Sequence, residues 1–214
     1  MRNLAINLET FGFIERERLS DGKIKIFRCG RDFLYYAFNY YYPEKFNPEI
    51  NNPEKLEQSH AFGLPIPFWL YFTSLQFIYV PKFLAENNLK LLINDKQINS
   101  FFDFFIAMAK SIKISVVERI KQIENAIDNN FVSGINFSFG LRNRFFDHIM
   151  MVYGYDQDNL YVFDTHQVPE LEYEKLRQDN KYLMKLPKEI IKQRWSLLGR
   201  VWIIKPINSV KGSL

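Results

Sequence analysis

The sequence predicts an α+β fold, in which helices come first along the chain and antiparallel strands come second. Two observations carry this prediction. The first part of the chain holds long segments without glycine or proline, in which apolar residues recur at helical spacing. From Ser133 onward, short runs of β-branched and aromatic residues alternate with turn residues. We find no internal repeat, linker or composition shift, so we expect residues 1–214 to form a single domain.

Two segments are predicted to be helical. Residues 32–42 contain no glycine or proline, and Pro43 would end a helix there. A short β-like stretch at 23–27 precedes this helix. The segment 111–130 has polar residues between apolar ones at helical spacing, namely Val116, Val117, Ile120, Ile123 and Ile127. We expect that apolar stripe to pack in the core.

Four strands are predicted in the second part of the chain, at 134–141, 148–155, 160–165 and 199–206. The turn residues DQDN at 156–159 join the second and third of these strands, which indicates a hairpin.

The segment 60–81 contains no Lys, Arg, Asp or Glu and is long enough to span a bilayer. It also contains three prolines together with Thr73, Ser74 and Gln76, and no basic cluster flanks it closely. We therefore expect no membrane span here. The aromatic-rich part, 62–79, is instead expected to be buried or to line one wall of a substrate groove.

Charge and cysteine content narrow the function classes. The chain has 28 Lys and Arg against 24 Asp and Glu, a net charge of +4, and the basic residues are scattered. This distribution does not predict a nucleic-acid partner. A single cysteine forms no internal disulfide, and the first residues lack the layout of a secretory signal. We expect a cytoplasmic protein.

That single cysteine, Cys29, lies at or just before the first turn of the predicted helix. Backbone N–H groups at a helix N-terminus stabilise a thiolate and lower the pKa of the thiol, and Gly30 would let a substrate approach the backbone. A free cysteine more often simply packs in a core. Thiol catalysis also needs a histidine and a group that orients it, for which His148 and Asp164, at the two ends of the hairpin, are the candidates.

Strand register decides whether His148 and Asp164 can meet. With a two-residue loop, 157–158, Asp164 points to the opposite face from His148. With a three-residue loop, 157–159, Val152 pairs with Asp164 and His148 shares that face. A catalytic pair therefore requires an odd-length loop or a β-bulge.

The remaining histidines are competing or structural candidates. His166 would share the face of His148 and Asp164 in the odd-loop register, and His60 is expected to be structural or groove-lining. No grouping of His, Cys, Asp and Glu has metal-ligand spacing, and no glycine-rich phosphate loop occurs. The sequence therefore predicts neither a metal nor a cofactor.

Several motifs occur in a family-like order: CG at 29–30, IENAIDNNFVSGINF at 123–137, HIMMVYGYDQDNLYVFD at 148–164 and GRVWII at 199–204. This order resembles the papain-like superfamily, and within it the bacteriocin-processing (double-glycine leader) peptidase-like group. FGLPIPFWLYF at 62–72 also resembles a segment of the butirosin biosynthesis protein H family, in its N-terminal domain.

The resemblance implies a papain-like cysteine peptidase fold, with an N-terminal nucleophile helix packed on an antiparallel sheet. It implies that Cys29 is the nucleophile, His148 the general base and Asp164 the residue that orients the histidine. The expected activity is cysteine-dependent acyl transfer through an acyl-thioester, as a peptidase, an amide hydrolase or an acyltransferase. The expected substrates are a peptide or an acyl-carrier or other acyl-thioester.

Two positions depart from the peptidase pattern. Lys23 stands where those enzymes have a glutamine that donates to the oxyanion, and Arg28 stands where an acidic residue is common. Loss of one oxyanion donor costs on the order of a hundredfold or more in rate, unless Lys23 replaces it. The alternative function is a catalytically silent papain-like binding module. A third class, a membrane-associated protein using 61–81, would fractionate with lipid.

Overall fold

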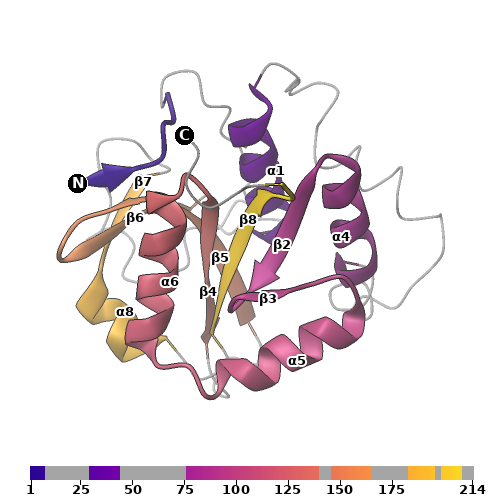
Figure 1. Ribbon diagram of the computed structural model, residues 1–214. Helices are drawn as coiled ribbons and strands as arrows, with labels where there is room; N and C mark the ends of the chain where they lie inside the picture. Colours follow the sequence, from indigo (N-terminus) through magenta and orange to yellow (C-terminus); the bar gives the residue numbers. More distant parts are fainter. Residues whose placement is uncertain (8–28, 44–75, 140–145, 165–182, 196–198, 209–214) are drawn as a thin grey trace, which may run out of the picture.

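The computed structural model describes residues 1–7, 29–43, 76–139, 146–164, 183–195 and 199–208. Its centre is an antiparallel sheet with the order β3-β2-β8-β4-β5-β6-β7, and β1 pairs with β5 outside this path (Figure 1). The strands are β1 (Arg2–Asn3), β2 (Leu89–Ile93), β3 (Lys96–Gln97), β4 (Val132–Phe139), β5 (Phe146–Tyr155), β6 (Asn159–Phe163), β7 (Leu183–Pro187) and β8 (Arg200–Pro206).

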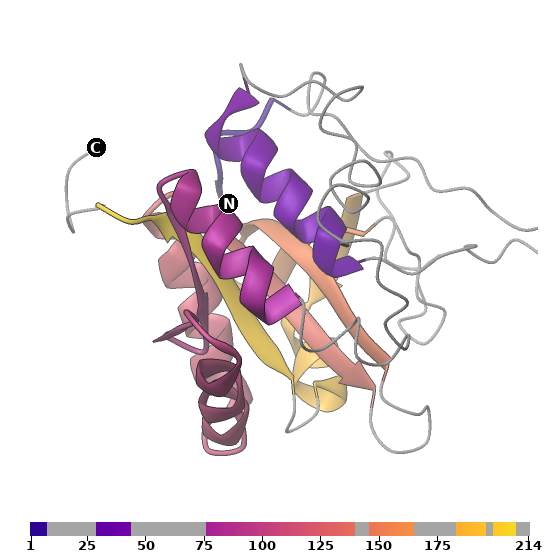
Figure 2. The ribbon, with the colours of Figure 1, turned by 90° about the vertical axis from the view of Figure 1, so that its right-hand side faces the viewer.

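Helices cover both faces of this sheet. They are α1 (Cys29–Tyr41), α4 (Gln76–Glu86), α5 (Phe101–Ser111), α6 (Val116–Asp128) and α8 (Lys188–Arg194). Helix α1 packs on β4 and β5 from one side, and α6 packs on β4, β5 and β8 from the other (Figures 1 and 2). The predicted combination of helices with an antiparallel sheet is confirmed.

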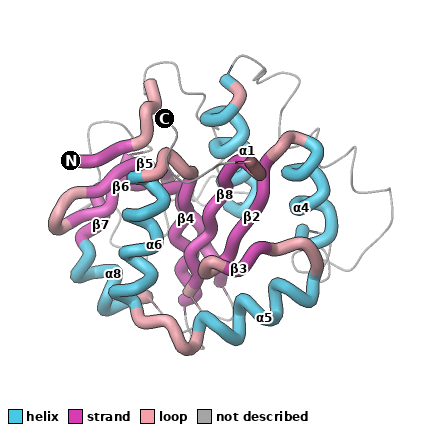
Figure 3. The backbone as a smooth tube through the Cα atoms, viewed as in Figure 1, coloured by secondary structure: helices cyan, strands magenta, loops and turns pink. Residues whose placement is uncertain are grey.

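The predicted order of elements is only partly correct, as the tube in Figure 3 shows. The hairpin of β2 and β3 lies between α4 and α5, and α8 follows β7, so helices and strands are not divided into two halves. The predicted strands at 134–141, 148–155, 160–165 and 199–206 correspond to β4, β5, β6 and β8. The stretch 23–27 and most of 60–81 lie outside the described residues.

The predicted helix at 111–130 begins later than expected, because a local cap separates it from α5. The Ser115 hydroxyl accepts a hydrogen bond from the Glu118 backbone N–H, and the Glu118 carboxylate accepts one from the Ser115 N–H. This capping box satisfies the first N–H groups of α6 and starts the helix at Val116. The preceding apolar residues form the separate helix α5, which begins after the N-cap Ser100.

The core lies on both sides of the sheet. On the α1 side, Phe33 meets Trp202 edge to face with ring centroids 6.1 Å apart, and Tyr36 meets Phe163 at 5.9 Å. On the other side, α6 buries Ile120, Ile123 and Ile127 of its predicted apolar stripe, whereas Val116 is half-buried and Val117 is 50% exposed, contrary to the prediction. Within the described ranges, no helix has the length and apolar character needed to cross a bilayer.

Helix α1 approaches the sheet closely because β4 has a glycine below it. A Cβ atom added to Gly134 would lie 2.7 Å from Cε2 of Phe33 and 3.1 Å from Cδ1 of Ile149. Both of those side chains are buried, and Trp202 also confines Phe33. The glycine therefore sets the height of α1 above β4 and β5.

We predict opposite effects for two neighbouring residues on β4. Gly134→Ala should lower the free energy of unfolding by about 1–3 kcal/mol, because the new methyl group overpacks against Phe33. Ser133→Ala should be neutral or stabilising, because its buried hydroxyl has no hydrogen-bond partner among the described residues. Urea unfolding measures both values, and a Gly134→Ala protein as stable as the wild type would contradict the close approach.

Candidate active site

The structure brings two of the predicted site residues together. His148 lies on β5, and Asp164 directly follows β6. The imidazole Nε2 is 3.0 Å from Asp164 Oδ1, a hydrogen-bonding distance. Both residues are buried, His148 being 0% exposed and Asp164 1% exposed. A buried carboxylate of this kind fixes the ring orientation and the tautomer of its histidine.

A β-bulge produces the register that this pair needs. At the loop, Tyr155 pairs with Leu160, which is the two-residue loop that alone would separate His148 from Asp164. Further along, Gly154 pairs with Tyr161 but Val152 pairs with Val162, so Tyr153 is an extra residue in β5.

Beyond the bulge the hairpin is shifted by one residue. Met151 pairs with Phe163, which extrapolates to Met150 opposite Asp164. His148 is two residues from Met150 and therefore projects from the same face as Asp164. Of the two routes that the sequence leaves open, the structure uses the bulge.

The tight loop is held by the carboxylate of Asp156. Its Oδ1 accepts from the backbone N–H groups of Asp158 and Asn159, and its Oδ2 accepts from the hydroxyl of Tyr161 at 2.6 Å. These hydrogen bonds, led by that of Tyr161, hold the pKa of Asp156 well below its usual range. The charged carboxylate thus stabilises the two-residue loop. Because the loop keeps this length, the shift that brings His148 and Asp164 to one face comes from the bulge.

The short strand β1 packs against the bulge. Asn3 pairs with Gly154, and the backbone N–H of Leu4 donates to the carbonyl of Tyr153 at 2.8 Å. A Cβ atom on Gly154 would lie 2.9 Å from the carbonyl oxygen of Arg2. Glycine at this position therefore lets β1 pair with β5, and that pairing satisfies the carbonyl of the extra residue.

The N-terminus of α1 lies toward the His148 end of the sheet. Phe33 contacts the region of Gly134 and Ile149, whereas the Tyr41 hydroxyl accepts from the Val132 N–H and donates to the Ile204 carbonyl. The helix axis thus runs from the Ile149 level of β5 toward the start of β4. Cys29 is one turn before Phe33, so it lies further in the direction of the end of the sheet where β5 begins.

Strand alternation also sets which face His148 occupies. Ile149 projects toward α1, since its Cδ1 is within 3.1 Å of a Cβ built on Gly134, beside Phe33. In the unbroken register of β4 and β5, the neighbouring His148 then projects to the opposite face. Phe163, in contact with Tyr36, likewise directs Asp164 away from α1. A thiol at Cys29 would have to meet this imidazole around the end of β5.

The other predicted site residues are described in part or not at all. Cys29 begins α1, but its side chain lies outside the described atoms, so its contact with His148 stays a prediction. Gly30 is the second residue of α1 and is half-buried. Lys23, His60 and His166 lie outside the described residues.

Sequence reasoning missed one buried carboxylate near the predicted nucleophile. Asp32 lies in the first turn of α1, three residues after Cys29, and is buried. Residues three apart on a helix are neighbours on its surface, so Asp32 bears on the charge around Cys29. In the sequence, Asp32 is only an acidic residue in the first turn of a predicted helix. Such residues commonly stabilise the helix dipole and do not by themselves indicate a functional site. In the described part of the chain, no three His, Cys, Asp or Glu residues group as metal ligands.

Comparison with known proteins identifies no relative. Family models, curated protein sequences and solved structures all failed to match this chain. The pairing of His148 with Asp164 therefore rests on its geometry alone.

We predict that Gly154→Ala separates β1 from the bulge. The free energy of unfolding should fall by about 1–3 kcal/mol, because the methyl group collides with the backbone of Arg2. Hydrogen exchange at the Leu4 amide should become faster, since its bond to Tyr153 is lost. As a matched control, Asn3→Ala leaves the backbone pairing intact and should stay within about 0.5 kcal/mol. Unchanged protection of Leu4 in Gly154→Ala would refute the account.

Proposed function

We propose that this protein is a cysteine-dependent acyl-transfer enzyme with papain-like architecture, in which Cys29, His148 and Asp164 form the catalytic triad. The observation that carries the proposal is the buried hydrogen bond between His148 and Asp164. Two further features support it: a helix that begins at Cys29, and the direction of that helix, whose N-terminus points toward the end of the sheet where β5 begins. The pairing of His148 with Asp164 depends on one position in β5, the bulge at Tyr153.

Each residue has a defined role in this proposal. Asp164 holds Nε2 of His148, so Nδ1 is the ring atom that accepts the Cys29 proton. The thiolate sulfur attacks a carbonyl carbon, and the imidazolium returns the proton to the leaving group as the acyl-thioester forms. Water or an amine then attacks the thioester carbonyl and releases the thiol, which separates a hydrolase from an acyltransferase.

The N-terminus of α1 provides N–H groups and partial positive charge that stabilise negative charge in the proposed reaction. The first N–H groups of a helix have no partner within the helix, so those of Cys29 and Gly30 are suited to hold an oxyanion. The same helix end favours a thiolate and lowers the pKa of the thiol. The carboxyl group of Asp32, three residues further along the helix, would act in the opposite direction in its charged form. The substrate class is a peptide or an acyl-carrier thioester, with Lys23 as the further candidate donor.

The second candidate function is a silent binding module that keeps the same architecture. Strand alternation favours it, because His148 and Asp164 project away from the face on which α1 packs. In that case the pair is a buried structural element of the sheet, and Cys29 is a packing residue.

The pH dependence of Cys29 alkylation distinguishes the two functions. With iodoacetamide and intact mass as the readout, the triad predicts fast modification of the native protein with an apparent pKa below about 8.5. Asp164→Asn should slow the reaction or raise that apparent pKa, because the imidazole loses its charged partner. His148→Ala should do so more strongly. The single cysteine makes the signal specific, and Cys29→Ala provides the blank.

Controls separate loss of chemistry from loss of folding. Removing one partner of a buried pair costs about 3–5 kcal/mol, so His148→Ala must be assessed by circular dichroism, and Asp164→Asn is the milder variant. His166→Ala tests the competing histidine and should leave alkylation unchanged. Slow modification that is indifferent to both His148 and Asp164 would overturn the enzyme proposal in favour of the binding module.

A further inference from the structure

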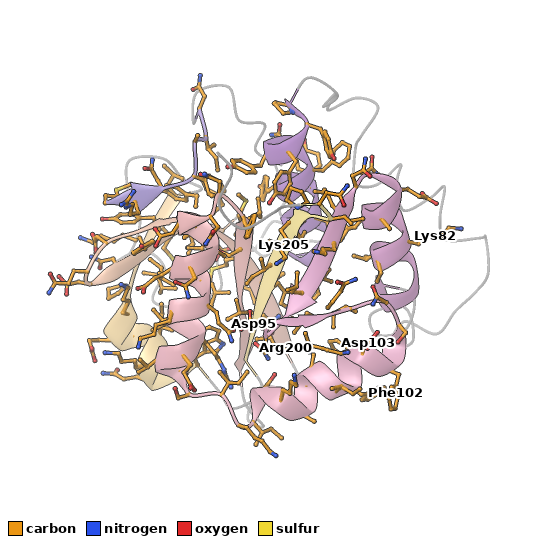
Figure 4. The ribbon with its side chains drawn as sticks, in the orientation of Figure 1. Lys82, Asp95, Phe102, Asp103, Arg200 and Lys205 are labelled. Atoms are coloured by element: carbon orange, nitrogen blue, oxygen red, sulfur yellow. The ribbon has the colours of Figure 1, made fainter. Side chains whose placement is uncertain are left out.

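Helix α5 is apolar on its outward side as well as on its inward side. Its inward residues, among them Phe104 and Ala107, are buried. Phe102 is nevertheless 71% exposed and Phe105 52% exposed, and Ile112, at the C-cap, is 56% exposed. Figure 4 shows Phe102 pointing away from the body of the protein. Helices that are apolar all round are normally covered on every side.

The charges around this outward face are positive. Lys110 and Lys113, at the C-terminal end of α5, are both exposed. The acidic residue of α5, Asp103, is paired with Lys96 at 3.0 Å and accepts a hydrogen bond from the Asn99 N–H. The bond from Lys96, followed by that from Asn99, lowers the pKa of Asp103, which therefore stays ionised and neutralises Lys96.

Outside the α5 face itself, the neighbouring helix adds a further cation. Lys82 is exposed on α4, which contacts α5, and it projects outward on the same side of the view in Figure 4. A row of exposed phenylalanines with lysines at its margins is the pattern of a helix that lies in a bilayer interface.

We propose that the outward face of α5, formed by Phe102, Phe105, Ala109 and Ile112 with Lys110 and Lys113, binds the surface of an anionic lipid bilayer. The apolar side chains enter the interface, and the lysines contact anionic headgroups. This function is additional to the acyl transfer proposed above and does not depend on it.

Charge and chemistry favour lipid over a second copy of the chain. A symmetric dimer through this face with its two α5 helices parallel would bring Lys110 and Lys113 close to the same residues of the partner, which repel. The four apolar side chains offer no directional hydrogen bond for a specific protein partner. A bilayer interface requires neither shape complementarity nor directional bonds, only apolar insertion and opposite charge.

Vesicle co-sedimentation tests the proposal. We expect the protein to bind vesicles of phosphatidylcholine mixed with phosphatidylserine, and to bind phosphatidylcholine alone much more weakly. High salt should reduce the binding, because it screens the lysines. The double variant Phe102→Ser/Phe105→Ser and the charge reversal Lys110→Glu/Lys113→Glu should each weaken binding by about tenfold or more.

Matched controls come from exposed residues elsewhere. Ile207→Ser, at the end of β8, and Lys192→Glu, on α8, should bind vesicles as the wild type does. Because all the substituted residues are exposed, circular dichroism and the melting temperature should be unchanged. Two results would overturn the proposal: no binding to anionic vesicles, or binding that neither double variant weakens. A dimer in light scattering that Phe102→Ser/Phe105→Ser dissociates, without vesicle binding, would assign the face to self-association instead.

Discussion

The extra residue at Tyr153 in β5 is the constraint on which the candidate site depends. Without it, the two-residue loop of the hairpin would direct His148 and Asp164 to opposite faces of the sheet. A bulge interrupts a ladder and leaves backbone groups to be satisfied. Here β1 satisfies the carbonyl of Tyr153, and Gly154 leaves room for that strand. A local irregularity, a distant strand and a glycine together thus determine whether two buried polar side chains meet.

The candidate site has two requirements: a stable buried pair of His148 and Asp164, and access of a thiol and a substrate to the imidazole. A buried histidine and carboxylate are stable when they hydrogen-bond to each other, and the 3.0 Å contact between His148 Nε2 and Asp164 Oδ1 meets that requirement. Catalysis also needs a thiol and a substrate to reach the imidazole. Helix α1 begins with Cys29, but it packs on the side of the sheet toward which Ile149, and not His148, projects. The proposed chemistry therefore depends on how the end of α1 meets the end of β5.

Local patterns account for what the sequence predicted correctly, and distant contacts account for what it missed. Strands β4, β5, β6 and β8 follow from alternating residues and turn chemistry, and the hairpin spacing was enough to nominate His148 and Asp164. The choice between bulge and longer loop depends on Leu4, far away in the sequence, so the spacing left it open. Strand β2 was missed although Asn87 and Asn88 form a turn at its start, because periodicity alone does not distinguish a short apolar run such as LKLLI from a helical segment. The approach of Phe33 to Gly134 is likewise invisible to any window of local sequence.

Proton NMR of the imidazole N–H groups in water detects the hydrogen bond between His148 and Asp164 itself. The account predicts a resonance far downfield of the amides, in slow exchange with water because the ring is buried. It should disappear in Asp164→Ala and persist in His166→Ala. A wild-type spectrum without this resonance, or one in which it survives Asp164→Ala, would contradict the pairing and with it the register set by the bulge.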